Sequence, residues 1–224
     1  MIKKIGIITF HESNNYGTCL QAFGLQQAIK KMGYESEIIN YKRSNISNTE
    51  NTILLRIKNL VNKSFKELLL YPYIKKLNKS KNDKFIKFRN DKFNYSDKIH
   101  TSFNDLMSNL KKYDAYVCGS DMIWSDARAD DLDVFFLKFS EKGKRIAYAP
   151  SFGSNSIQKT SETKYIKLLK GIDYLSCREK SGVNIIKNLI NKKAELVVDP
   201  TLLIDGKEWR TIVSKKPSNN NYIL

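Results

Sequence analysis

Three side chains that can do acid–base or anion chemistry, His11, Asp121 and Arg178, each stand just after a short apolar segment of the sequence. An imidazole titrates near neutral pH and can act as a general acid or base. A carboxylate can orient or deprotonate a hydroxyl group, and a guanidinium binds carboxylates and phosphates. We therefore take these three residues as candidate catalytic residues.

Each of the three also has a structural alternative. His11 could serve only as a hydrogen-bonding group at the end of a strand. Asp121 could cap a helix, and Arg178 could form a buried ion pair with Glu179 or Asp199. The residue types alone leave these alternatives open.

Other residues that follow these apolar segments could bind a substrate. Asn side chains can hydrogen-bond a hydroxylated ligand, but Asn is also among the best helix N-caps. Aromatic rings can stack on a sugar, but aromatic residues at strand ends more often pack in the core. The candidate binding residues are Asn14, Asn15, Tyr16, Gly17, Ser120, Trp124, Ser151 and Glu179.

Short apolar segments alternate with helical patterns along most of the chain, which predicts an α/β fold with a parallel sheet flanked by helices. A helix capped by Ser102 belongs to this pattern. Ligands of open α/β sheets bind at the carboxyl ends of the strands, so the candidate residues should meet in one cleft. The predicted strands are residues 5–10, 37–41, 114–118, 145–149, 174–177 and 195–198.

The first strand-to-helix turn, residues 11–17, is polar and bulky rather than glycine-rich. It has neither the G-x-G-x-x-G pattern of dinucleotide-binding folds nor the phosphate-wrapping P-loop. The turn therefore suits a hydroxylated ligand better than a pyrophosphate.

Residues 45–94 depart from this alternation and predict a basic helical insertion. Apolar residues from Ile53 to Leu69 recur at helical spacing between lysines and arginines. Pro72 should interrupt this helix, and a second helix should run through Phe85 and Phe88. Such a basic amphipathic helix can lie on an anionic membrane, but we favour packing on its own domain.

Composition limits the classes of function. The 224 residues carry a net charge of +16 and contain 41% hydrophobic residues, without an apolar run long enough to span a membrane. No nucleic-acid-binding motif accompanies the charge, so we expect no nucleic-acid partner. Cys19, Cys118 and Cys177 are widely spaced and predict reduced thiols. These features predict a cytoplasmic protein, with peripheral contact at the inner face of the membrane as an option.

Five blocks of residues, in this order, together resemble the polysaccharide pyruvyl transferase family. The resemblance covers most of the chain except the lysine-rich insertion. Met122 and Pro150 depart from the family pattern, which commonly has Gln and a small residue there, without removing a reactive group. The blocks are residues 10–22 (F-H-x-x-x-N-Y-G-x-x-L-Q-A), 119–124 (G-S-D-x-x-W), 148–153 (Y-x-x-S-F-G), 178–182 (R-E-x-S-G) and 199–203 (D-P-T-L-L).

The resemblance implies transfer of a pyruvyl group from phosphoenolpyruvate to sugar hydroxyls of a glycan or lipid-linked glycan acceptor, usually as a cyclic ketal. It implies no cofactor and no metal besides this donor substrate. It also implies two Rossmann-like halves arranged as in GT-B glycosyltransferases. On this basis residues 1–206 would form the N-terminal, acceptor-side domain. Residues 207–224 would form a linker and the first strand of a truncated second domain, and this chain alone could be inactive.

Two other classes of function stay open at this stage. A GT-B-like glycosyltransferase that uses a nucleotide sugar would have a similar fold. A non-catalytic binding domain, associated with a membrane through the basic insertion, would also fit. The sequence gives no indication of an oligomeric state.

Overall fold

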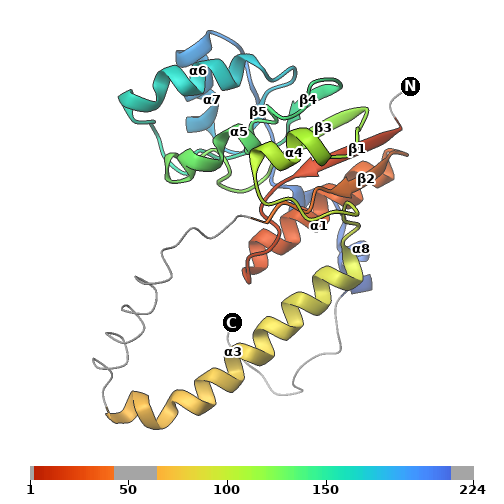
Figure 1. Cartoon of the computed structure of the whole chain (residues 1–224), viewed down its shortest axis with the longest axis vertical. Helices are drawn as coiled ribbons and strands as arrows, with labels where there is room; N and C mark the ends of the chain where they lie inside the picture. Colours follow the sequence, from red (N-terminus) through yellow and green to blue (C-terminus); the bar gives the residue numbers. More distant parts are fainter. Residues whose placement is uncertain (1–2, 43–64, 213–224) are drawn as a thin grey trace.

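The computed structural model describes residues 3–42 and 65–212, which fold around a parallel β-sheet with helices on both faces (Figure 1). The strands are β1 (Lys4–Ile8), β2 (Glu35–Ile38), β3 (Ala115–Cys118), β4 (Lys144–Ala147), β5 (Ser176–Cys177) and β6 (Glu195–Leu196). The helices are α1 (Tyr16–Lys31), α3 (Phe65–Lys92), α4 (Phe103–Asn109), α5 (Leu132–Phe135), α6 (Glu162–Lys170), α7 (Lys180–Ile190) and α8 (Gly206–Ile212). Short 3-10 turns lie at Asp126–Asp131, Lys159–Ser161 and Pro200–Leu202.

The strands are parallel throughout the described residues, as the alternating pattern predicts. The main sheet has the order β2-β1-β3-β4, and β5 pairs with β6. The amide of Ala147 donates to the carbonyl of Tyr174 over 2.9 Å, which continues the sheet from β4 into β5. All carboxyl ends therefore lie along one edge.

The two faces of the sheet have separate cores because side chains alternate along each strand. Ile5, Ile7 and Val117 face α1 and the C-terminal part of α3. Tyr116 and Cys118 face the opposite side, where α4 to α7 pack. Figure 1 shows α1, α3 and α8 on one side of the sheet and α4 to α7 on the other.

The helix that contains Pro72 differs from the sequence prediction. The α3 helix runs without a break from Phe65 to Lys92. Proline removes one helical hydrogen bond, but residues 73–92 include seven lysines, one leucine and one arginine, which are good helix formers and help to sustain the helix. Phe85 and Phe88 pack toward α1, as predicted for packing on the chain's own domain. No helix in the described ranges is long and apolar enough to cross a membrane.

Other predicted boundaries shift by one or a few residues. The second strand begins at Glu35 rather than at residue 37, since the amide of Glu35 donates to the carbonyl of Lys3. Ser102 caps α4 as predicted, by accepting from the amide of Asp105 over 3.1 Å. Residues 53–64 of the helix predicted over residues 53–69 lie outside the described residues, as does the strand predicted near residue 222.

The last described helix, α8, packs against α1. The Trp209 ring, on α8, lies 5.7 Å from the Phe23 ring, and its indole N–H donates to the carbonyl of Thr201. A Cβ atom at Gly24 would lie 2.5 Å from the carbonyl oxygen of Pro200. The missing side chain at Gly24 thus lets the loop after β6 approach α1 closely.

Gly119 allows a second close approach, between the loops after β3 and β4. Its φ angle is +127°, and a Cβ atom there would lie 1.9 Å from the carbonyl oxygen of Tyr148. Only glycine fits this position, which directly precedes Ser120 and Asp121.

We predict that Gly119→Ala destabilises the protein by at least about 3 kcal/mol, because strain and a backbone clash act together. Gly33→Ala is the matched control. Gly33 also has a positive φ, of +87°, but no atom lies within 4 Å of the point that a Cβ atom would occupy there, so the cost should be about 1 kcal/mol. Chemical denaturation of both variants measures the difference, and equal losses would contradict the prediction.

Candidate functional site

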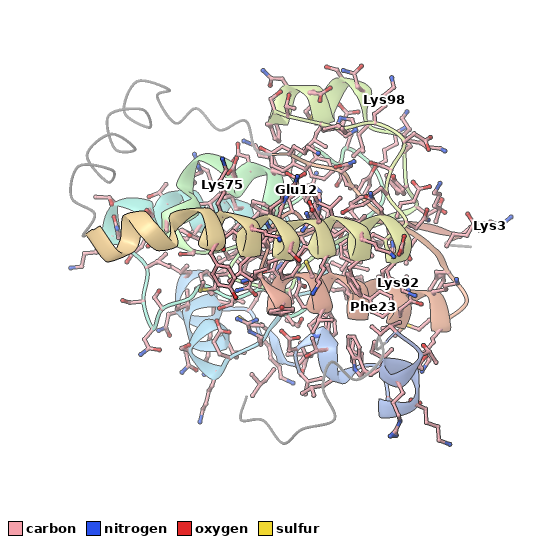
Figure 2. All side chains as sticks on the ribbon, turned by 90° about the horizontal axis from the view of Figure 1, so that it is seen from below. Lys3, Glu12, Phe23, Lys75, Lys92 and Lys98 are labelled. Atoms are coloured by element: carbon pink, nitrogen blue, oxygen red, sulfur yellow. The ribbon has the colours of Figure 1, made fainter. Side chains whose placement is uncertain are left out.

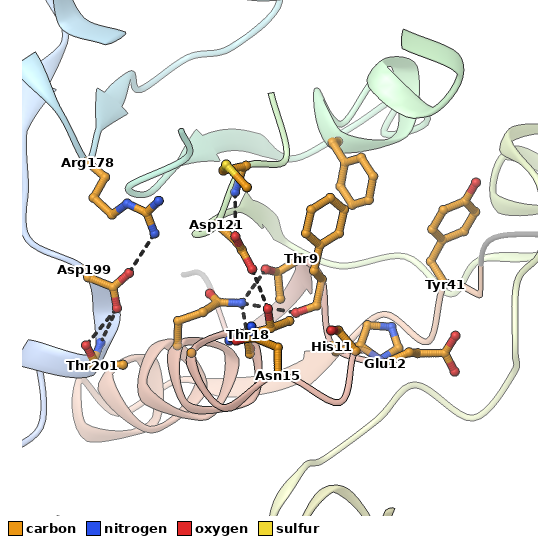
Figure 3. Close-up of a pocket in the computed structure, with 16 residues that line it drawn as sticks. Thr9, His11, Glu12, Asn15, Thr18, Tyr41, Asp121, Arg178, Asp199 and Thr201 are labelled. Atoms are coloured by element: carbon orange, nitrogen blue, oxygen red, sulfur yellow. Dashed lines mark hydrogen bonds and ion pairs between the residues drawn. The ribbon is translucent and has the colours of Figure 1, made fainter. Parts of the chain in front are cut away.

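A cavity of about 550 Å³ lies at the carboxyl edge of the sheet (Figure 3). Its lining comes from the β1–α1 turn, the first turns of α1, and the loops that follow β3, β5 and β6. The predicted meeting of these strand ends is therefore confirmed for the loops that reach the cavity. The lining residues are Thr9, Phe10, His11, Glu12, Ser13, Asn15, Gly17, Thr18, Gln21, Tyr41, Asp121, Met122, Phe135, Arg178, Asp199 and Thr201.

The start of α1 forms one wall of the cavity. Asn15 is the N-cap, and its Oδ1 accepts from the amide of Thr18 over 3.1 Å. Gln21 follows one turn later and is buried. Its Nε2 lies 2.9 Å from the Thr9 hydroxyl, and its Oε1 accepts from the amide of Ser120 over 3.0 Å. One side chain thus joins the ends of β1 and β3.

Asp121 projects into the cavity from the loop after β3 (Figure 3). Its Oδ2 accepts from the hydroxyl of Thr18 over 2.8 Å, and its Oδ1 accepts from the amide of Met122 over 2.8 Å. Its φ angle is +75°, in the left-handed region that non-glycine residues rarely adopt. Such strain is concentrated at functional sites. Asp121 caps no helix in the described residues, so its contacts differ from the predicted structural alternative.

Arg178 and Asp199 form the opposite end of the lining. The Arg178 Nη1 lies 3.1 Å from the Asp199 Oδ2, and its Nε lies 3.9 Å from the Glu179 Oε2. The other Asp199 oxygen accepts from the amide and the hydroxyl of Thr201. Arg178 is about one-third exposed, so its guanidinium combines the predicted ion pair with access to the cavity.

His11 lines the cavity although only 2% of its surface is exposed. Neither ring nitrogen makes a well-formed hydrogen bond to the described residues, although the backbone of Tyr41 lies close enough to act on the imidazole. Its ring packs edge-on against Tyr95 at 5.3 Å. Burial lowers the pKa of His11 to about 4, against smaller opposing effects of Glu12 and of the Tyr41 backbone. The imidazole is therefore neutral near pH 7.

The cavity is acidic although the whole chain is strongly basic. Among the described lining residues, Glu12, Asp121 and Asp199 carry carboxylates and Arg178 carries a positive charge. Glu12 also pairs with Lys42, which lies outside the lining, over 3.0 Å. Carboxylates and neutral polar groups accept hydrogen bonds from hydroxyl groups. This lining suits a neutral polyhydroxylated ligand better than a multiply charged anion.

Two aromatic residues that the sequence suggested for sugar binding, Trp124 and Tyr16, do not line the cavity. Trp124 is fully buried, stacks on Phe136 with ring centroids 4.3 Å apart, and donates to the carbonyl of Phe135. It is a core residue because the loop after β3 turns back under α5. Tyr16 is 68% exposed and packs against Phe85 of α3, outside the cavity.

Several other candidate residues support the cavity without lining it. Asn14 hydrogen-bonds Asn82 and Arg89 of α3. Glu179 accepts from the amide of Phe152. The remaining two, Ser120 and Ser151, are buried and link the loop after β3 to the loop after β4, through contacts to Ala149 and Asp121.

Sequence reasoning missed Thr9, Thr18 and Gln21 as site residues. A usable signal was present, because Asn15, Thr18 and Gln21 are spaced three residues apart. This spacing places polar side chains on one side of the helix start; Asn15 is the exposed N-cap, and Thr18 and Gln21 are buried. Buried polar side chains need partners, and here the partners are the strand ends.

The three cysteines are buried, and their thiols are held in the protonated form. Cys19, Cys118 and Cys177 are buried and free of disulfides. Burial raises the pKa of each thiol, that of Cys177 to about 12, which keeps it protonated and unreactive. No group of three His, Cys, Asp or Glu residues among the described side chains could hold a metal ion.

The fold and the cavity define an α/β protein with a polar ligand site at the carboxyl edge of its sheet. Residues 15–224 match the family described as polysaccharide pyruvyl transferase. The chain therefore belongs to the polysaccharide pyruvyl transferase family. Comparisons with curated proteins and with solved structures found no significant match.

We predict that His11 makes stability depend on pH. Its pKa is about 4 in the folded protein and about 6.5 when unfolded, so the unfolded chain binds the proton first as pH falls. The free energy of unfolding should decrease by about 2 kcal/mol from pH 7 to pH 5 through this group. Denaturation at both pH values tests this: His11→Gln should remove that decrease, and an unchanged pH dependence would contradict it.

Proposed function

We propose that the protein transfers a pyruvyl group from phosphoenolpyruvate to two hydroxyls of a sugar in a cell-surface polysaccharide precursor, and that the described domain binds the acceptor. Membership of the pyruvyl transferase family supports the class of reaction. The observation that carries the acceptor assignment is the acidic, hydroxyl-accepting lining of the cavity.

The reaction sets clear chemical demands. A proton adds to the methylene carbon of the donor, and a sugar oxygen bonds to the adjacent carbon. The carbon–oxygen bond to phosphate then breaks, phosphate leaves, and a second sugar oxygen closes the ketal. Two hydroxyl protons are lost, one proton becomes part of the new methyl group, and the other leaves with phosphate. A base near each hydroxyl would assist the reaction.

Asp121 and His11 are the two bases that we assign to the acceptor hydroxyls. The Asp121 carboxylate is held by Thr18 and by the amide of Met122, which fixes its direction into the cavity. The backbone of Tyr41 faces one N–H of the His11 imidazole, and the neutral ring keeps a lone pair for the ligand. It can accept a proton from one hydroxyl or orient it by a hydrogen bond.

Arg178 is the residue that we assign to the anionic donor. Its Nη1 is occupied by Asp199, and its remaining N–H groups can bind a carboxylate or phosphate oxygen. A donor with a carboxylate and a phosphate needs more positive charge than this cavity supplies. We infer that a second α/β half, in a GT-B-like arrangement, provides the other cations. The acceptor is a glycan or a lipid-linked glycan.

We predict that Asp121→Asn lowers acceptor-dependent phosphate release from phosphoenolpyruvate by about 10²- to 10⁴-fold, the usual effect of removing a general base. Arg178→Ala should mainly weaken binding of the donor and raise its KM. The assay uses the full-length protein and a panel of methyl hexosides as acceptors, with mass spectrometry of the product to detect the ketal.

Asp97→Asn and Arg210→Ala are matched controls, because both residues are exposed and lie outside the cavity. Both controls should retain full activity. Unchanged rates in Asp121→Asn and Arg178→Ala would refute the site assignment. Stabilisation by a nucleoside diphosphate, without any by phosphoenolpyruvate, would instead point to a nucleotide-sugar glycosyltransferase.

The acceptor assignment has a separate test by ligand-observed NMR. If the described domain binds the acceptor, a methyl hexoside should show saturation transfer from this chain, and His11→Gln should weaken it. Phosphoenolpyruvate should show no comparable signal with this chain. Tight binding of phosphoenolpyruvate without binding of any hexoside would assign the cavity to the donor.

A further inference from the structure

A second cavity, of about 610 Å³, lies between α1 and α3, and we call it the α1–α3 groove. Its apolar walls include Tyr16 and Leu20 from α1 and Leu77 and Phe85 from α3. Lysine side chains of α3 also line it. None of the residues that we assign to pyruvyl transfer lines this groove.

The groove has an exposed apolar surface where α3 extends past α1. In Figure 1 the N-terminal half of α3 projects away from the sheet, and only its C-terminal part lies against the domain. Tyr73 is 63% exposed and Leu77 is 51% exposed, one helical turn apart on the same face. Tyr16, at the start of α1, is 68% exposed. Tyr16 and Leu77 therefore remain accessible in the groove, and Tyr73 extends the exposed apolar surface one turn beyond it.

The charge around this surface is strongly positive. Residues 73–92 contain seven lysines and one arginine but only two aspartates. None of these cations forms an ion pair with a carboxylate of the described residues. The Lys81 ammonium group lies 5.7 Å from the Tyr16 ring centre and 5.8 Å from that of Phe85. Figure 2 shows α3 crossing the molecule from Lys75 to Lys92.

We propose that the α1–α3 groove and the exposed face of α3 dock onto an anionic phospholipid surface. Exposed aromatic and aliphatic side chains can enter the headgroup boundary, while lysines on the same helix bind lipid phosphates. Lysine stems can also cover apolar surface and keep their charge in water. A second copy of the same face would instead bring two unpaired sets of lysines together.

The position of the groove gives this docking a consequence for the first cavity. Tyr16 lines the groove, whereas its neighbours Asn15 and Gly17 line the cavity that contains Asp121. A single helical turn thus separates the two. Docking through Tyr16 would hold the polar cavity at the lipid–water boundary, within reach of a membrane-bound glycan. This consequence depends on the proposed function, but the docking itself does not.

Vesicle sedimentation of the unmodified chain tests the proposal without any measurement of enzyme activity. We expect binding to vesicles of phosphatidylcholine with about 30% phosphatidylglycerol, loss of binding at high salt, and little binding to phosphatidylcholine alone. The double variant Lys81→Glu with Lys84→Glu should bind at least about tenfold more weakly. Leu77→Ser should cause a smaller loss, because it removes apolar contact and keeps the charge.

Lys112→Glu with Lys142→Glu is the control, since it changes net charge equally at exposed lysines away from α3. This control should bind nearly as well as the unmodified chain, and circular dichroism should show that all variants are folded. The proposal is wrong if the chain does not sediment with the anionic vesicles or if both double variants lose binding equally. It is also wrong if Leu77→Ser dissociates a dimer of a chain that binds no vesicles.

Discussion

The hydrogen bonds of Gln21 and Thr18 tie α1 to the loop after β3, and the cavity depends on them. Parallel pairing of β1 with β3 places Ile8 beside Cys118, so both chains leave the sheet together with unpaired backbone groups. Gln21 donates to the carbonyl of Phe10 and accepts from the amide of Ser120, and it also contacts the Thr9 hydroxyl. Thr18 then fixes the Asp121 carboxylate. Because buried polar groups are costly when unpaired, loss of this network would release both walls of the cavity.

The fold places negative charge at the cavity and much of the positive charge on α3, a separation that the net charge of the chain does not reveal. A chain of +16 has an acidic cavity, and much of its unpaired positive charge lies on α3. The carboxylates at the cavity are held by hydroxyl and amide donors, by Arg178 or, for Glu12, by Lys42, so that few cations are needed to stabilise them. Most lysines of the described part of α3 are exposed to solvent, which hydrates their charge. The basic surface and the polar cavity therefore present different chemistry on either side of the first turn of α1.

Much of this architecture follows from local sequence rules. Alternation of apolar strands and helices predicts the parallel sheet and its carboxyl edge, and Ser102 and Asn15 cap helices as good capping residues do. Three-dimensional packing decides the rest. Trp124 lies in the core because a loop folds under α5, which no local pattern encodes. α3 continues through Pro72 because strong helix formers follow it, and a proline by itself indicates a break more often than not.

Burial of His11 costs folding free energy but can favour ligand binding. A buried imidazole without well-formed hydrogen bonds forfeits those that it makes with water, at about 1–3 kcal/mol. The same burial lowers its pKa and keeps it neutral, so the side chain retains one donor and one acceptor. A hydroxylated ligand in the cavity can donate to the lone pair and recover part of that cost on binding. Because the Tyr41 backbone faces the N–H of His11, the remaining lone pair favours a ligand with hydroxyl groups over an anion, which has no proton to donate.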